Sequence, residues 1–109
     1  MDIIALEQDL KSRALKPIYL FYGQETFLRE RYTARLIGII DERLFELNFE
    51  NLLAEENPVP DVLQRAQSMP FLSPPRVVIV RGVDRYTSEE LSGFNEYIND
   101  PNESTCLVL

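Results

Sequence analysis

The segment from Pro17 to Glu30 places an apolar strand, a single glycine and a helical stretch in direct succession. Residues 18–22 form an apolar run of strand length, and the residues that follow Gly23 favour a helix. Nucleotide-binding proteins carry their phosphate-binding loop in this position, between the first strand of a parallel sheet and the next helix. The segment therefore favours an α/β fold of that kind.

The loop itself lacks the residues for phosphate chemistry. Counting from Gly23, the second glycine, the lysine and the hydroxyl residue of a working loop would stand where this chain has Leu28, Arg29 and Glu30. Leucine lacks the backbone freedom of glycine, and a carboxylate repels bound phosphate. The sequence therefore predicts a degenerate loop that binds no nucleotide cofactor.

The length and composition fit one globular domain. At 109 residues the chain can bury a real core but cannot hold a second domain. Hydrophobic residues make up 45% and charged residues 27%, which excludes a wholly disordered chain. The longest apolar runs are of strand length and the start is not basic, so we expect a cytoplasmic protein with no export signal or membrane contact.

Negative charge is concentrated in the second half of the chain. Residues 44–109 hold four basic and eleven acidic groups, which account for the whole net charge of -7. Because binding to a phosphate backbone normally needs clustered Lys and Arg, the chain is not expected to grip DNA or RNA by itself. The basic residues that do cluster, Arg29, Arg31, Arg35 and Arg43, are most simply an ion-paired, solvated helix face, with a protein contact as the alternative.

Groups for metal binding or nucleophilic catalysis are scarce. The chain has no histidine, and its single cysteine, Cys106, lies in an apolar segment where we expect a buried, inert thiol. A Cys–His pair and an ordinary zinc site are both excluded. Asp84, Glu89 and Glu90 follow a predicted strand and could bind a metal in a doubly wound fold, although a turn and a helix cap explain them more simply.

The whole chain alternates strands with helices. Helices are predicted over residues 3–15, 25–40, 57–68 and 87–98, and strands over residues 18–22, 44–53, 76–80 and 104–109. Such alternation predicts a three-layer α/β fold, with a parallel sheet covered by helices on both faces. Because the chain stops within its last predicted strand, we expect residues 1–109 to be an N-terminal domain that lacks its last strand and the domains that follow.

Four of the predicted elements carry specific signals. Asn57-Pro58 offers a helix cap followed by proline in the first turn, and Thr87-Ser88-Glu89-Glu90 is a capping box. The segment 44–53 alternates apolar and polar residues, as a half-exposed strand does. The apolar stripes expected to face the core are Leu28, Tyr32, Leu36, Ile39 and Ile40 in the second helix, and Leu91, Phe94 and Ile98 in the fourth.

Four stretches of the chain resemble, in order, the landmarks of one protein family. They are residues 17–28, residues 69–73 with the strand 76–80 that follows, residues 89–91, and residues 104–109. Together they resemble the bacterial DNA polymerase III delta subunit, a clamp-loader subunit, over essentially all of the chain. The resemblance implies a domain with the AAA+ ATPase fold that has lost nucleotide binding. Consistent with this, Arg81 and Gly82 stand where an ATPase would carry its metal-binding aspartate and catalytic glutamate.

The pair Phe71-Leu72 lies in a proline-bounded loop and is the most informative site. From the residues alone, burial beneath the loop is the simpler expectation, because hiding each side chain from water contributes about 1.5–3 kcal/mol. The resemblance instead implies an exposed wedge that enters a hydrophobic pocket on the sliding clamp. In that interpretation Met69 and Pro70 support the wedge, and Pro74-Pro75 stiffens the loop.

The resemblance also implies the partners and the kind of activity. These are the sliding clamp, or beta subunit, and the other clamp-loader subunits, with DNA reached only through the complex. The domain would help to open the clamp ring during replication and would have no catalytic residues, cofactor or metal. Two alternatives remain at this point: a signalling or scaffold module of doubly wound, perhaps flavodoxin-like, type that binds a metal or a protein, and a small nucleotide-binding enzyme that uses the Gly23 loop.

Overall fold

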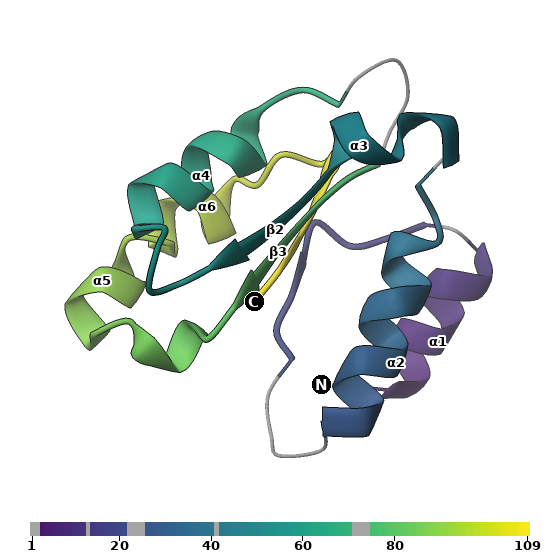
Figure 1. The fold of residues 1–109 in the computed structure, drawn as a ribbon, viewed down its shortest axis with the longest axis horizontal. Coiled ribbons are helices and arrows are strands. Elements are labelled where there is room, and N and C mark those ends of the chain that lie inside the picture. The colour runs from purple at the N-terminus through teal and green to yellow at the C-terminus, as the bar shows by residue number, and fades with distance from the viewer. Residues whose placement is uncertain (1–2, 13, 22–25, 41, 71–74) are drawn as a thin grey trace.

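A four-stranded parallel sheet with the strand order β1-β4-β3-β2 forms the centre of the fold (Figure 1). The computed structural model describes residues 3–12, 14–21, 26–40, 42–70 and 75–109. The strands are β1 (Ile18–Tyr19), β2 (Phe49–Leu53), β3 (Arg76–Arg81) and β4 (Thr105–Val108). The helices are α1 (Ile3–Ser12), α2 (Thr26–Ile37), α3 (Phe45–Asn48), α4 (Val59–Gln67), α5 (Ser88–Ser92) and α6 (Asn95–Asn99), with 3-10 turns at Glu42–Leu44 and Val83–Arg85.

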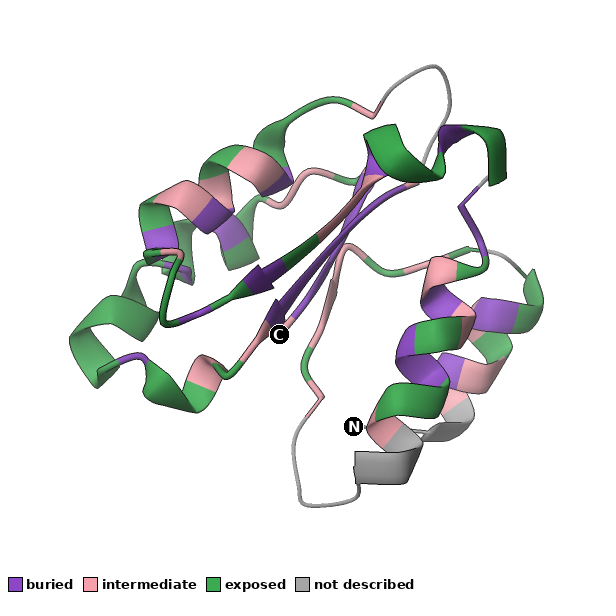
Figure 2. Ribbon diagram, viewed as in Figure 1, coloured by how far each residue is buried: buried purple, intermediate pink, exposed green. Residues whose placement is uncertain are grey.

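Alternating side chains of the two central strands build a core on each face of the sheet. Val77 and Ile79 pack with residues of α1 and α2, whereas Val78 and Val80 pack with residues of α4 and α6. The side chains of β4 alternate between the two cores in the same way. Both β3 and β4 are buried along almost their whole length (Figure 2). The predicted three-layer α/β fold, with a parallel sheet and helices on both faces, is confirmed.

The second helix and the described part of its apolar stripe are also confirmed. α2 occupies most of the predicted range, and Tyr32, Leu36, Ile39 and Ile40 are all buried on the same side of the sheet. The side chain of Leu28 lies outside the described residues. α1 ends at Ser12, and residues 14 and 15 of the predicted first helix are not helical.

The prediction of a strand over residues 44–53 is wrong in its first half. The chain forms the turn at Glu42–Leu44 and then α3, and the strand begins only at Phe49. The pairing register gives the reason, because Phe49 lies opposite Val77, the second residue of β3. β3 has only one residue before Val77, namely Arg76, so β2 could extend back by one residue at most, and a helical turn gives the preceding backbone groups local partners.

The predicted cap at Asn57 is also wrong. Pro58 occupies the N-cap position of α4, without a side-chain hydrogen bond. The Asn57 side chain instead accepts a hydrogen bond from the Leu53 amide at 3.3 Å and donates one to Asp61 at 2.7 Å. Asn57 therefore closes the turn between β2 and α4, as asparagine often does.

The capping box at Thr87 is confirmed, because Thr87 accepts a hydrogen bond from the Glu90 amide and the Glu90 side chain accepts one from the Thr87 amide. The single helix predicted after it is divided into α5 and α6. This break changes which residues face the core, since a stripe at i, i+3 and i+7 requires an uninterrupted helix. Leu91 and Ile98 are therefore exposed, whereas Phe94 and Tyr97 are buried.

Candidate functional site

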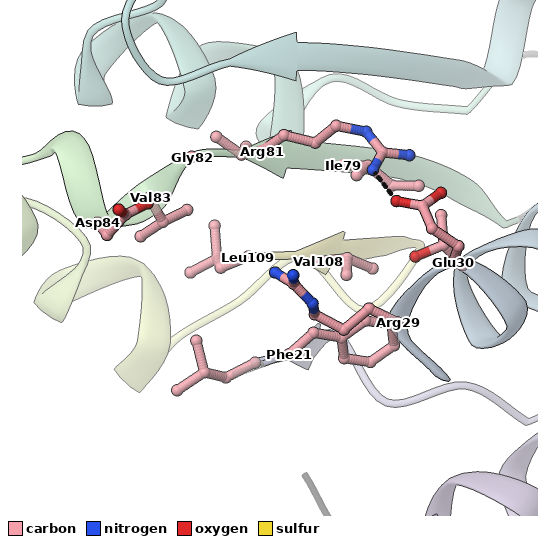
Figure 3. Close-up of a pocket in the computed structure, with 13 residues that line it drawn as sticks. Phe21, Arg29, Glu30, Ile79, Arg81, Gly82, Val83, Asp84, Val108 and Leu109 are labelled. Carbon is pink, nitrogen blue, oxygen red and sulfur yellow. Dashed lines mark hydrogen bonds and ion pairs between the residues drawn. The ribbon is translucent and has the colours of Figure 1, made fainter. Parts of the chain in front are cut away.

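A pocket of about 550 Å³ opens at the carboxyl ends of the strands, beside the first turns of α2 (Figure 3). In doubly wound folds this end of the sheet is where ligands bind. The pocket is lined by Leu20, Phe21, Arg29, Glu30, Thr33, Ile79, Val80, Arg81, Gly82, Val83, Asp84, Val108 and Leu109. It therefore occupies the place where the sequence located a degenerate phosphate loop.

Glu30 and Arg81 meet at the rim of this pocket. Nη1 of Arg81, the last residue of β3, lies 2.6 Å from Oε1 of Glu30 on α2. Nε of the same guanidinium donates a hydrogen bond to Oδ1 of Asn51 on β2, at 3.2 Å. One arginine side chain therefore links a helix to two strands. Sequence reasoning noted both residues as misfits in nucleotide motifs but did not predict that they pair.

Of the other residues of the predicted degenerate loop, the structure describes the side chain of Arg29. Arg29 extends from α2 into the pocket (Figure 3), whereas Gly23 and the side chain of Leu28 lie outside the described residues. Gly82 follows β3 with φ of 76°, a left-handed conformation that a glutamate in that position would adopt only with strain.

The metal site considered for Asp84, Glu89 and Glu90 has no support in the structure. Asp84 lines the pocket, whereas Glu90 is used in the capping box of α5. In the described part of the chain, no group of three or more His, Cys, Asp or Glu side chains is arranged to hold a metal ion.

The thiol of Cys106 is buried in the core beneath α1 and α2. Burial raises its pKa to about 12, so the thiol stays protonated and is a poor nucleophile. The expectation of a buried thiol is confirmed.

In the arginine cluster, Arg35 forms an ion pair with a residue of another helix. Arg35 lies 2.7 Å from Glu7 on α1, and the Tyr32 hydroxyl donates a hydrogen bond to the same carboxylate at 2.8 Å. The hydrogen bond from Arg35, followed by that from Tyr32, lowers the pKa of Glu7. Part of the predicted solvated face therefore joins the two helices of one layer.

The second candidate site is the segment between α4 and β3, at the opposite end of the sheet. Phe71 and Leu72 lie outside the described residues, so their burial or exposure remains a prediction. Their neighbour Met69 has 75% of its surface exposed, and Pro70 is half-buried. A large apolar side chain in water is therefore present where the sequence predicted support for a wedge.

Arg76 fixes both ends of this segment, and sequence reasoning missed it. Its Nε donates a hydrogen bond to the Arg65 carbonyl at 3.1 Å, and its Nη1 donates one to the Leu47 carbonyl at 3.0 Å. Nη2 forms an ion pair with Oε2 of Glu50 at 3.1 Å. Only 8% of Arg76 is exposed, although the sequence offers only a hint of this, namely an arginine at the start of an apolar strand.

The comparison with family models decides what kind of chain this is. The model for the DNA polymerase III delta subunit matches residues 19–109. The chain belongs to this family. The delta-subunit resemblance inferred from the sequence is thereby confirmed.

A curated Bacillus subtilis sequence and a solved Bacillus subtilis structure agree with the assignment to the delta-subunit family. The DNA polymerase III subunit delta of strain 168 is 28% identical over 111 residues, which cover 94% of this chain and 32% of that protein. The solved structure of the DNA clamp loader delta protein YqeN is 25% identical and superposes with a TM-score of 0.81, covering 96% of this chain and 34% of that one. The chain thus spans about a third of the length of these delta proteins.

None of the helices that the structure describes in this delta-family chain is long and apolar enough to span a membrane.

Proposed function

We propose that this domain binds the sliding clamp through an apolar wedge formed by Phe71 and Leu72, supported by Met69 and Pro70, and so helps to open the clamp ring. The observation that carries the proposal is the exposed Met69 beside a segment whose two ends are tied together by Arg76. An exposed apolar side chain next to two more in the sequence makes a small hot spot, and fixed ends lower the entropy lost on docking.

The same proposal makes the domain a non-catalytic relative of AAA+ ATPases. The pocket at the carboxyl ends of the strands has Arg29 and Glu30 in place of the lysine and the hydroxyl residue, and Arg81 and Gly82 in place of the acids. Arg81 is a cation and cannot bind magnesium, and Glu30, the one carboxylate among these four residues, is paired with it. The domain therefore uses no nucleotide cofactor.

Ring opening follows from a difference in affinity. A ligand shifts an equilibrium only by as much as it binds one state better than the other. A wedge that fits the open clamp better than the closed one holds the ring open without hydrolysing ATP itself. The energy that exposes the wedge comes from nucleotide-binding partner subunits of the clamp loader.

The proposed partners are therefore the beta clamp and the other subunits of a clamp-loader complex. The net charge of -7 supports a protein partner and indirect contact with DNA, since direct contact would require basic residues. A cytoplasmic location, where replication takes place in bacteria, is part of the same proposal.

Calorimetric titration of the domain with the clamp of the same organism tests the proposal. The parent domain should bind saturably. A Phe71→Ala, Leu72→Ala variant should lose about thirtyfold in affinity per residue, as expected when hot-spot side chains worth about 2 kcal/mol each are truncated. Thermal melting of both proteins shows whether the variant is still folded.

A matched control is available away from the proposed site. Leu53 and Ile98 are also exposed apolar side chains, with 40% and 52% of their surface in water. A Leu53→Ala, Ile98→Ala variant should bind the clamp as the parent does. Equal binding by the wedge variant, or absence of binding by the folded parent domain, would contradict the proposal.

A further inference from the structure

The ion pair between Glu30 and Arg81 joins two elements that are distant in the sequence. Glu30 lies in the second turn of α2, and Arg81 ends β3, 51 residues later. Both residues line the pocket, and Figure 3 shows the Arg81 side chain reaching from its strand toward the Glu30 carboxylate. The hydrogen bond from Arg81 to Asn51 steadies the guanidinium from the side of β2.

In a working ATPase with this topology, the same two positions are linked through a metal ion. The hydroxyl residue of the phosphate loop and the aspartate at the end of the strand both hold the magnesium that accompanies the nucleotide. The metal thus adds a link between the helix and the strand, beyond their core packing, while nucleotide and metal are bound. In this chain the helix position carries a carboxylate and the strand position carries a cation.

We propose that the Glu30–Arg81 ion pair replaces this metal bridge, so that α2 is held against β3 permanently and without nucleotide. Arg81 and Glu30 are positioning residues in this role. The inference rests on the proposed function, because it requires the pocket to be a nucleotide site that has lost its ligand.

The chemistry of the two groups suits such a permanent link. A guanidinium stays charged at every physiological pH, and its separate N–H groups can bond Glu30 and Asn51 together. The side chains are 55% and 39% exposed, so the pair is neither deeply buried nor fully solvated. Its effect should therefore be local and dependent on salt.

A double-mutant cycle followed by amide hydrogen exchange tests the link. The proteins are the parent chain, Glu30→Gln, Arg81→Gln, the double Gln variant, and the charge-swapped Glu30→Arg, Arg81→Glu variant. Each single variant should accelerate exchange in α2 by about twofold to fivefold at low salt, as expected for a partly exposed pair, and by less at 0.5 M salt, a concentration on the order at which such pairs are screened. The double Gln variant should be no faster than either single variant, and the swapped variant should regain part of the protection.

Arg85 and Glu55 provide a matched control. They form a more exposed ion pair, at 3.5 Å, and the two residues follow β3 and β2 in the chain. Removing both charges there, with Glu55→Gln and Arg85→Gln, should leave exchange in α2 unchanged. Additive effects of the two single substitutions at positions 30 and 81, or no effect in α2, would overturn the inference even if all variants remain folded.

A further measurement, hydrogen exchange of the parent chain with magnesium and ATP added, distinguishes failure of this inference from failure of the proposed function. No change in exchange is expected. Slower exchange in α2 with magnesium and ATP would show that the pocket binds nucleotide, and it would overturn both the non-catalytic assignment and the replacement of the metal. If ATP has no effect and the cycle shows no coupling, only the role of the ion pair is refuted.

Discussion

Nε of Arg76, the first residue of β3, donates a hydrogen bond to the main-chain carbonyl of Arg65 in the last turn of α4, at 3.1 Å. The same guanidinium forms an ion pair with Glu50, whose other oxygen lies 2.8 Å from Nη1 of Arg65. The end of α4 and the start of β3 are therefore held together by side chains as well as by their backbone. Whatever partner the intervening segment contacts, its two ends start from fixed positions.

Replacement of Arg76 by glutamine should destabilise the domain by about 2–3 kcal/mol. The change removes charged hydrogen bonds from a buried site and leaves the half-buried Glu50 without one of its cations. Urea denaturation followed by circular dichroism measures the loss. Affinity for the clamp should also fall under conditions in which the variant is still folded, because the ends of the segment are no longer fixed.

Arg76→Lys is the matched variant for this prediction. Lysine keeps the charge but cannot present the planar fork that reaches Arg65, Leu47 and Glu50 at once. It should recover only part of the lost stability. Full recovery by lysine would mean that the charge alone matters and that the hydrogen bonds to the two carbonyls are dispensable.

Tyr86→Phe should cost about 1 kcal/mol of folding free energy. The Tyr86 hydroxyl donates a hydrogen bond to the Asn57 carbonyl at 2.5 Å, while its buried ring lies 6.2 Å from the ring of Phe94. Phenylalanine keeps the ring packing but leaves the Asn57 carbonyl without this donor, which is the origin of the cost. The free energy of unfolding in urea measures it. A variant as stable as the parent would show that water replaces the hydroxyl without loss.

The extent to which the fold could be predicted depended on how local each signal was. Strand β3 was predicted almost to the residue because four consecutive apolar residues leave no exposed face, and the capping box at Thr87 was predicted because its bonds join residues three apart. The helix at residues 45–48 was missed because only the register between Phe49 and Val77 shows that β3 offers at most one further partner to the residues before Phe49. That register is a property of the tertiary structure.

The features of the candidate site also differ in whether the sequence could predict them. Position counting identified Arg29, Glu30, Arg81 and Gly82 as unsuited to nucleotide chemistry, and the structure brings all four to one pocket. The ion pair within that pocket and the anchoring role of Arg76 could not be predicted, since both join residues that only the folded sheet brings together. Their sequence distances, 51 residues for the first and 29 for the bond to Leu47, exceed any local pattern.

Gly82→Ala should destabilise the domain by about 1–2 kcal/mol, the cost of a left-handed conformation for a residue with a Cβ atom. Gly82 has φ of 76°, and the nearest atom to an added Cβ would be Arg85 Cγ at 3.8 Å, so the cost comes from the backbone and not from a clash. Gly38→Ala is the control, since its added Cβ would lie 3.4 Å or more from its neighbours and its φ is not left-handed. Thermal melting of the two variants should separate them. Equal melting temperatures would contradict the prediction.

Stability should fall in acid partly through the carboxylate of Asp9. Hydrogen bonds from Lys16, at 2.8 Å, and from the Tyr19 hydroxyl, at 2.7 Å, lower the pKa of Asp9 below its ordinary value. A lowered pKa in the folded state contributes stability that is present above the pKa of the unfolded chain and is lost as the pH falls through the folded value. The loss attributable to Asp9 should therefore develop as the pH falls through and below about 4, the pKa of an unfolded aspartate. Asp9→Asn should flatten this part of the curve of unfolding free energy against pH, measured by urea denaturation at several pH values.

Lys16→Gln should flatten the same part of the curve, because it removes the largest cause of the lowered pKa of Asp9. If the Asp9→Asn curve is as steep as that of the parent, other carboxylates control the loss of stability in acid.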